Sequence, residues 1–212
     1  SGALNPQGRA DPDGSRLINV EATAALARNA KAAGAQVLFL STNQVFDGST
    51  RRRPANDTPC PITEYGRQKA DAERQVLEIL PTSTVIRLTK VLEPGFDLLN
   101  GWIQDLSQGR SVDAFSDMVM APVPLDTVAD ILIAVMDRRL GGILQVSGPE
   151  DISYSDAATH LARRLGANPE LVRPASAAGT DLPPEETPRH TTLNTERLAS
   201  ELDIRVPDAF GV

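Results

Sequence analysis

Few residues of the metal-binding and disulfide-forming types occur in this sequence. Cys60 is the single cysteine, which excludes an internal disulfide framework and a cysteine metal cluster. The two histidines, His160 and His190, lie far apart without ligand spacing, so we expect no metal site. No apolar run approaches membrane-spanning length and the N-terminus has no secretory h-region, so we expect a cytoplasmic protein without a membrane partner.

Net positive charge is also lacking. Lys and Arg number 21 against 28 Asp and Glu, and the resulting net charge of −7 argues against a nucleic-acid partner. For the basic run Arg51-Arg52-Arg53 two interpretations stay open, a solvated loop tip and a site for the phosphate of a nucleotide sugar. The hydrophobic content of 41% and the length of 212 residues suffice for a good core, as one domain or as one with a smaller lobe.

The informative stretch runs from Val37 to Lys69. Residues 37–41, VLFLS, form an apolar block without helical spacing that ends in a hydroxyl, as a buried parallel strand does. Thr42 then lies at the carboxyl end of the strand, where open α/β sheets form their ligand crevice. Tyr65 and Lys69 are four residues apart at an expected helix start, so both side chains share one face. A hydroxyl, a phenol and an ammonium are therefore expected at one place.

These three groups together suit one kind of chemistry. A tyrosine has an unperturbed pKa of about 10, and a neighbouring ammonium lowers that pKa by stabilising the phenolate. We expect Lys69 to do this for Tyr65, while the Thr42 hydroxyl donates a second hydrogen bond to the same substrate oxygen. Because no side chain supplies a hydride, the predicted chemistry is carbonyl reduction or alcohol oxidation with a bound cofactor.

The same residues resemble a known family. The segments Ser41-Thr42, Val45-Phe46-Asp47-Gly48 and Tyr65-Gly66-Arg67-Gln68-Lys69 are similar to the signature of the extended short-chain dehydrogenase/reductases, and VFDG most resembles their dTDP-4-dehydrorhamnose reductase branch. That branch includes the regulatory beta subunit of methionine adenosyltransferase. The resemblance implies an α/β fold, with a Rossmann-like doubly wound parallel sheet that lacks its N-terminal part and with a small C-terminal substrate lobe. It also implies NADP or NAD as cofactor, a nucleotide-sugar substrate and, as one option, a homodimer.

The resemblance also divides the chain and assigns roles. It places the dinucleotide-binding domain in residues 1–91 and 126–148 and the substrate lobe in residues 92–125 and 149–212. The residues that it assigns to catalysis are Thr42, Tyr65 and Lys69. Those that it assigns to cofactor binding are Asn19, Ser41, Tyr65, Lys69 and Thr89, and those assigned to substrate binding are Lys90 and His190.

Three of these assignments have an alternative. Asn19 is equally well explained as an N-terminal cap or as a polar residue in the first turn of a helix. His190 is also explained as a histidine of a surface loop. Lys90 stands where the family usually has an aromatic residue that packs on the sugar, and a lysine pairs with phosphate instead, so the identity of the sugar is open.

A glycine-rich phosphate-binding turn is missing from the sequence. A complete dinucleotide domain opens with a strand, such a turn and a helix whose N-terminus binds the pyrophosphate. The glycines before residue 37 are Gly2, Gly8, Gly14 and Gly34, and none lies in a turn of this kind. Three explanations stay open: a piece of a longer protein, a second chain that supplies the missing half, or a protein that does not bind a dinucleotide. We favour the first, because residues 37–41 would otherwise form an exposed hydrophobic sheet edge.

Periodicity and breakers predict the remaining elements. We expect loops over residues 1–16 and 174–188, and a polar loop over residues 49–64 that is either a lid or a plain connection. The expected strands are residues 37–41, 84–88 and 143–148. The expected helices are residues 17–33, 65–80, 96–109, 126–138 and 155–165, with Asp126 as an N-cap, and a short one follows residues 189–198.

The sequence therefore leaves three functional interpretations, in order of preference. The first is an enzyme that uses NAD(P) to reduce a keto group on a nucleotide-activated deoxysugar. The second is a regulatory or binding subunit with the same fold, and the third is a sugar-nucleotide epimerase or dehydratase. Trp102 is interpreted as a core residue rather than as a platform for the substrate, because large aromatic side chains mostly pack.

Overall fold

A three-stranded parallel sheet forms the centre of the larger part of the molecule. The computed structural model describes residues 11–93, 95–178, 180, 182–183, 187–208 and 210, so the loop predicted over residues 1–10 lies outside the described residues. The strands lie in the order β1 (Leu38–Thr42), β2 (Thr84–Leu88) and β7 (Gly142–Val146). Thr42 pairs with Leu88 and Leu88 with Val146, so all three carboxyl ends meet at one edge. The predicted α/β class with a parallel sheet is confirmed.

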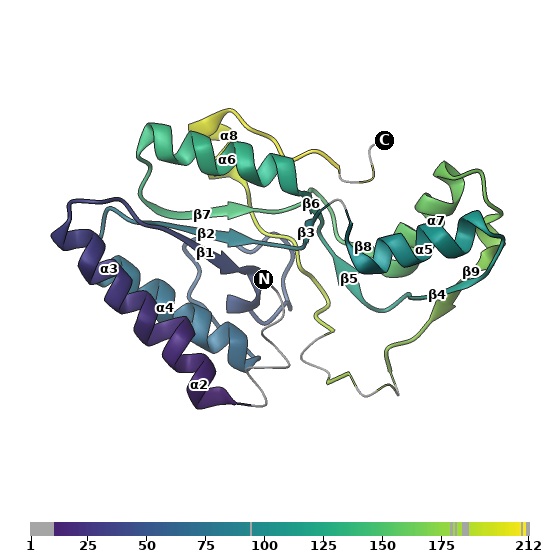
Figure 1. Ribbon diagram of the computed structural model, residues 1–212, viewed down its shortest axis with the longest axis horizontal. Helices are drawn as coiled ribbons and strands as arrows, with labels where there is room; N and C mark the ends of the chain where they lie inside the picture. The colour runs from purple at the N-terminus through teal and green to yellow at the C-terminus, as the bar shows by residue number, and fades with distance from the viewer. Residues whose placement is uncertain are drawn as a thin grey trace.

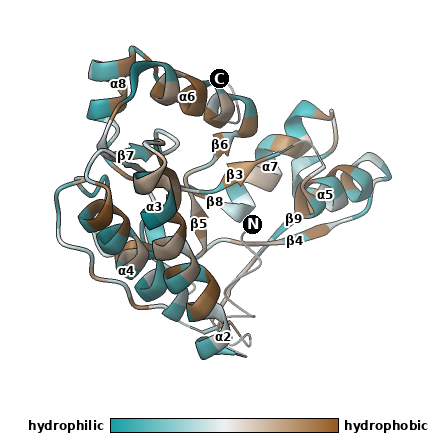
Figure 2. Cartoon of the chain, turned by 60° about the vertical axis from the view of Figure 1, so that its left-hand side comes forward, coloured by the Kyte–Doolittle hydropathy of each residue, from teal (hydrophilic) through white to brown (hydrophobic). Residues whose placement is uncertain are grey.

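Helices cover both faces of this sheet (Figure 1). One face carries α2 (Pro12–Arg16), the π-helical turn η1 (Leu17–Ala22), α3 (Thr23–Ala32) and α4 (Glu64–Ile79). The other face carries α6 (Leu125–Arg138) and α8 (Glu196–Leu202). Both α4 and α6 have hydrophilic and hydrophobic stretches, as amphipathic helices that cover a core do (Figure 2). Parallel neighbouring strands require a crossover connection, and helices supply it here. The chain passes from β1 through α4 to β2, and from β2 through α6 to β7.

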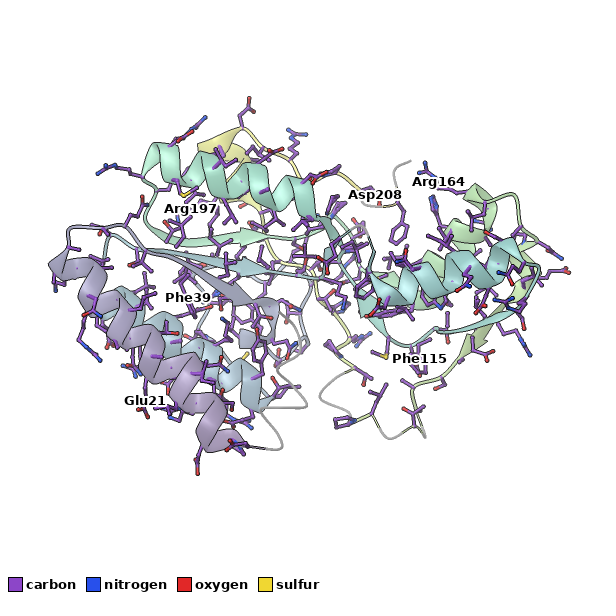
Figure 3. All side chains as sticks on the ribbon, in the orientation of Figure 1. Glu21, Phe39, Phe115, Arg164, Arg197 and Asp208 are labelled. Carbon is purple, nitrogen blue, oxygen red and sulfur yellow. The ribbon has the colours of Figure 1, made fainter. Side chains whose placement is uncertain are left out.

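The two layers have separate cores. On the α6 side, Ile86 and Leu144 of the sheet pack against Ile131 and Leu198. On the α3 side, Val37 packs against Ala27 and Val76, with Phe39 beside them. Figure 3 shows Phe39 between β1 and the α3 and α4 layer. β2 is buried on both faces, which explains why it reads as an apolar run without alternation, whereas Leu40 of the outer strand β1 is 44% exposed.

The smaller part of the molecule lies beside the carboxyl edge of the sheet (Figure 1). It contains the helices α5 (Asp97–Ser107) and α7 (Tyr154–Arg164) and a short turn η3 (Pro169–Leu171). Its paired strands are β4 (Val112–Phe115) with β9 (Val172–Ala175) and β5 (Val119–Met120) with β8 (Ile152–Ser153). A third pair, β3 (Val91–Leu92) with β6 (Val123–Pro124), connects it to the sheet.

Trp102 lies in the core of this smaller part. Its side chain is 6% exposed and its ring meets that of Tyr154 edge to face, with 6.4 Å between the ring centroids. Leu106, Val112 and Ala158 belong to the same cluster. The interpretation of Trp102 as a core residue therefore holds.

Three local predictions were wrong at helix and strand boundaries. Residues Pro12–Arg16 are helical rather than a loop, because the Asp11 carboxylate accepts the N–H of Gly14 at 2.9 Å and a proline occupies the first turn. Asp126 is not the N-cap of α6, since the helix already begins at Leu125. Pro174 lies in β9 opposite Ala114 rather than in a loop.

The C-terminal segment returns to the sheet. Leu198 and Leu202 of α8 pack in the core that contains Leu144. Arg197 donates hydrogen bonds to the carbonyl oxygens of Ile143 at 2.8 Å and Gly141 at 2.7 Å, and Figure 3 shows its side chain between α8 and β7. This segment belongs to the expected substrate lobe in the sequence-based division, yet it packs on the sheet. Among the described residues, no helix combines the length and the apolar character needed to cross a membrane.

Candidate active site

The carboxyl end of β1 is followed by a tight turn that Thr42 stabilises. The 3-10 turn η2 (Asn43–Val45) begins directly after Thr42. The Thr42 hydroxyl accepts a hydrogen bond from the N–H of Gln44 at 3.2 Å, and the side chain is buried. The backbone therefore leaves the sheet directly after Thr42, and the turn fixes the position of the Thr42 hydroxyl.

The first turn of α4 packs directly against η2. Thr63 caps α4 by accepting the N–H of Gly66 at 2.9 Å, and its hydroxyl donates to Gln44 Oε1 at 3.2 Å. Gly66 lies so close to this turn that a Cβ there would lie 2.1 Å from the carbonyl oxygen of Gln44. Tyr65 is the neighbour of Gly66 on α4, so this contact brings its turn of helix against the residues that follow Thr42.

Lys69 points from α4 towards the end of β1. Its ammonium donates a hydrogen bond to the carbonyl oxygen of Leu40 at 2.6 Å and lies 4.2 Å from the centre of the Phe39 ring. Burial lowers the pKa of Lys69 to about 8, and the carboxylate of Glu73 acts in the opposite direction. The ammonium is therefore held beside β1, two residues before Thr42 and one helical turn from Tyr65.

The predicted lowering of the Tyr65 pKa was wrong for this structure. Burial raises the pKa of Tyr65 above its ordinary value, because apolar surroundings disfavour the phenolate. The Lys69 ammonium, which was expected to offset this effect, donates to the Leu40 carbonyl. Tyr65 therefore carries its proton near neutral pH.

The side chains expected to bind the cofactor have partners within the protein. The Asn19 amide donates to Gln68 Oε1 at 2.9 Å. Because Asn19 is the third residue of η1, its alternative role as an N-terminal cap was wrong, whereas a polar residue in the first turn fits. The Ser41 hydroxyl donates to Glu73 Oε1 at 2.5 Å. The Thr89 hydroxyl donates to the carbonyl oxygen of Ala121. These three side chains therefore contribute to packing around the sheet edge in the described structure.

The two residues assigned to the substrate lie further along the chain. Lys90 follows the end of β2 and is half-buried, with its ammonium 4.5 Å from the centre of the Phe96 ring. Burial lowers the pKa of Lys90. His190 Nδ1 lies 3.1 Å from Asp151 Oδ2 in the loop after β7. The structure thus gives Lys90 an aromatic neighbour and His190 a carboxylate neighbour.

The basic run was not a simple solvated loop tip. Arg51 and Arg52 are exposed and both pair with Glu150. Arg53 is 19% exposed, and it contacts Asp47 at 3.2 Å and the sulfur of Cys60 at 2.9 Å. The loop therefore packs on the chain after β7 through Glu150, and its backbone also pairs with the C-terminal segment at residue 193.

Sequence reasoning missed two buried charged residues beside this site. Glu73 of α4 and Arg87 of β2 are 3% and 1% exposed, and they form an ion pair at 2.7 Å. Arg87 lies within an apolar strand, and a charge in a strand that is otherwise buried requires a partner nearby. An arginine within an apolar strand therefore predicts a buried carboxylate partner. The sequence alone does not tell which carboxylate that partner is.

Comparison with known families accounts for this arrangement. The family described as RmlD substrate binding domain matches residues 8–209. The chain belongs to this family. Members are expected to share its fold, and the described sheet, lobe and C-terminal return all lie within the matched residues.

Relatives of known name extend the comparison. This RmlD-family chain is 32% identical over 192 residues to a probable dTDP-4,6-dihydroxy-2-methyloxan-3-one 4-ketoreductase of Streptomyces antibioticus, which covers 88% of this chain and 64% of the relative. It is 26% identical over 216 residues to methionine adenosyltransferase 2 subunit beta of Pongo abelii, covering 95% of this chain and 63% of that protein. The chain therefore spans somewhat less than two thirds of the length of these relatives.

A solved structure shares the fold. The dTDP-4-dehydrorhamnose reductase of Bacillus anthracis, crystallised in complex with NADP, superposes with a TM-score of 0.84 at 19% sequence identity. The match covers 98% of this chain and 72% of that structure. At this identity the likeness supports the Rossmann-like fold of the RmlD-family chain.

Proposed function

We propose that this chain is the catalytic and substrate-binding part of an NAD(P)-dependent reductase that reduces the keto group of a nucleotide-activated deoxysugar. The observation that carries the proposal is the close contact between Gly66 of α4 and the Gln44 turn, because it joins the helix of Tyr65 to the strand end at Thr42. The relatives named as 4-ketoreductase and dTDP-4-dehydrorhamnose reductase support this reaction class.

In this proposal each of three residues acts on the reacting carbonyl group. Tyr65 donates its proton to the carbonyl oxygen of the substrate, and its raised pKa keeps that proton available near neutral pH. The Thr42 hydroxyl donates a second hydrogen bond to the same oxygen, so the developing negative charge is stabilised from two sides. The Lys69 ammonium adds positive charge at the same edge of the sheet.

The residues at this edge fit the nicotinamide-ribose half of a dinucleotide. The Lys69 ammonium beside β1 and the phenol of Tyr65, one turn earlier on α4, are donors that suit ribose hydroxyls, so we assign this contact to Lys69 and Tyr65. Asn19, Ser41 and Thr89 remain further proposed cofactor contacts, and in the structure each is hydrogen-bonded within the protein, as Lys69 is. NADP or NAD, when bound, supplies the hydride, and the NADP complex of the Bacillus anthracis enzyme supports NADP.

The domain division and the substrate contacts are also proposals. We place the dinucleotide-binding domain in residues 1–91 and 126–148 and add α8 to it, because Leu198 packs in the core of the sheet. Residues 92–125 and 149–195 then form the substrate lobe. Lys90 and His190 are the proposed contacts to the nucleotide sugar. A homodimer is also proposed, and light scattering tests it by measuring the molar mass in solution.

Replacing Tyr65 by phenylalanine tests the proposal. We expect the rate of NADPH oxidation with a dTDP-4-keto-6-deoxysugar to fall by at least about a hundredfold, as loss of a general acid does. Tyr154 is the other tyrosine of the chain and packs on Trp102, so Tyr154→Phe is the matched control with nearly unchanged turnover. If Tyr65→Phe turns over like the unmodified protein, the mechanism is wrong.

A second function is favoured by one comparison. The similarity to methionine adenosyltransferase 2 subunit beta supports a subunit that retains the fold and acts by binding another enzyme. In that case the protein forms a stable complex with an enzyme partner but does not oxidise NADPH in the presence of keto-sugar nucleotides. Measuring NADPH oxidation by absorbance separates the two functions.

A further inference from the structure

Arg87 of β2 and Glu73 of α4 form a buried ion pair between the sheet and the helix that carries Tyr65 and Lys69. Arg87 donates from Nε to both carboxylate oxygens of Glu73 at 3.1 Å and from Nη2 to Oε2 at 2.7 Å. The two side chains are 1% and 3% exposed. Removing two charges from water is unfavourable, and their attraction offsets that cost only when the geometry is good and the remaining donors are satisfied. Net stability alone therefore gives little reason for a pair at this position.

The pair is connected to each segment that carries a proposed catalytic residue. Ser41, the residue before Thr42, donates its hydroxyl to Glu73 Oε1 at 2.5 Å. Glu73 itself lies on α4, the helix of Tyr65 and Lys69. The first connection is a charge-assisted hydrogen bond and the second is the helix itself, so displacement of the pair moves the strand end relative to the helix.

The pair also holds the loop that leads into α4. Arg87 Nη1 donates to the carbonyl oxygen of Ala55 at 3.1 Å. The Arg87 guanidinium lies 4.9 Å from the centre of the Phe46 ring, and the Arg53 guanidinium lies 5.2 Å from the same ring. Phe46 directly follows η2. The guanidinium therefore contacts the start and the middle of the segment between Thr42 and Tyr65.

Glu73 acts on Lys69 as well. It lies four residues further along α4, on the same face, and its negative charge raises the pKa of Lys69, which burial lowers to about 8. The other elements packed on α4 present mostly neutral groups here, apart from Arg16 at the end of α2, which pairs with Asp71 of α4 at 2.6 Å. From β1 they are the Leu40 carbonyl and the Phe39 ring, and from η1 it is the Asn19 amide on Gln68. From β2 the charged group is Arg87, which faces Glu73.

We propose that Glu73 and Arg87 are positioning residues for the reduction: their buried pair holds Thr42, through Ser41, and Lys69 in one arrangement at the sheet edge. This inference rests on the proposed function. A purely structural pair would stabilise the fold without affecting turnover or the protonation of Lys69. The two roles therefore predict different results for variants that remain folded.

The first experiment measures Lys69 without any enzymatic assay. The chain has three lysines, Lys31, Lys69 and Lys90, so labelling with an amine-reactive reagent at a series of pH values, read by mass spectrometry, follows each one separately. In Glu73→Gln we expect the pH of half-maximal labelling of Lys69 to fall by about one unit, because a nearby opposite charge is lost. Lys31 and Lys90 serve as internal references and should not change.

A matched control is available on the same helix. Glu78 is an exposed carboxylate of α4 that pairs with Arg74, so Glu78→Gln removes the same charge at a distance from the buried pair. We expect the labelling profile of Lys69 in this variant to match that of the unmodified protein. An unchanged Lys69 profile in Glu73→Gln overturns the inference.

The second experiment uses a double variant in which both charges are removed. Replacement of a buried ion pair by neutral side chains is often tolerated by the fold. The double variant Glu73→Gln with Arg87→Met can therefore be assayed even if a single variant unfolds. We expect kcat for keto-sugar reduction to fall by about tenfold to a hundredfold with little change in KM, since small misplacement of catalytic groups has this effect. A folded double variant with normal kcat overturns the inference. If the unmodified protein itself reduces no keto sugar, the proposed function is wrong, and the labelling of Lys69 still decides the role of Glu73.

Discussion

Substitution of Gly66 by alanine tests how closely α4 must approach the end of β1. Gly66 lies in the first turn of α4 with ordinary helical backbone, so the glycine is not needed for its conformational freedom. It is needed for space, because an added Cβ would lie 2.1 Å from the Gln44 carbonyl oxygen and 3.0 Å from Pro61 Cβ. An ordinary contact with that oxygen requires α4 to move by more than about 1 Å.

The expected magnitude follows from two opposing effects. Alanine stabilises an unobstructed helix by about 0.5–1 kcal/mol relative to glycine. Overpacking against groups that cannot move easily costs about 1–3 kcal/mol, and here the obstructing atom belongs to the backbone. We therefore expect Gly66→Ala to lower the free energy of unfolding by about 1–2 kcal/mol. The displacement of Tyr65 from Thr42 should also lower turnover by about a hundredfold.

A second glycine provides the control for this prediction. Gly101 lies in α5, and a Cβ there would meet nothing within 4 Å. Gly101→Ala should therefore raise the free energy of unfolding by about 0.5–1 kcal/mol. Urea denaturation followed by circular dichroism compares both variants with the unmodified protein. If Gly66→Ala is as stable as Gly101→Ala, the close approach of α4 to the strand end is not a feature of the molecule.

Two further predictions concern other parts of the fold. Burial acts to raise the pKa of Asp151, yet hydrogen bonds from Thr191, His190 and Thr192 lower it, so this carboxylate stabilises the fold above pH ~4 and loses its effect as the pH falls through the lower pKa of the folded state. Asp151→Asn should cost about 1–3 kcal/mol at pH 7 and should flatten the acid limb of the stability profile, and parallel profiles for the two proteins would contradict this reasoning. Trp102→Ala should cost about 3–5 kcal/mol because the side chain is 6% exposed, whereas a loss below about 1 kcal/mol in thermal unfolding would show that the cluster around it is not a core.

Much of the fold was predictable because its signals are local. The apolar block at residues 37–41, the second block at residues 84–88 and the third at residues 143–148 correspond to β1, β2 and β7 within one or two residues. Pro81 after α4 and Gly34 after α3 mark the helix ends that the sequence predicted. Boundaries failed where a side chain decided them, as at Asp11, whose carboxylate caps a helix in a stretch that reads as loop.

The candidate site was predictable only in outline. The apolar block before Thr42 places this residue at the end of a strand, and helical spacing places Tyr65 with Lys69 on one helical face. The partners of individual side chains did not follow. Ser41 was expected to face the cofactor, but its hydroxyl is bonded to Glu73, and the protonation of Tyr65 depends on burial that no single sequence reports.

The sequence by itself determined the elements and the chemical groups near the sheet edge, because both depend on residues that are neighbours in the chain. Only the tertiary structure decided which groups touch. The approach of Gly66 to Gln44 and the pairing of Glu73 with Arg87 join segments that are 14 or more residues apart. Such contacts arise when separate helices and strands pack into one core, where shape and desolvation choose the partners.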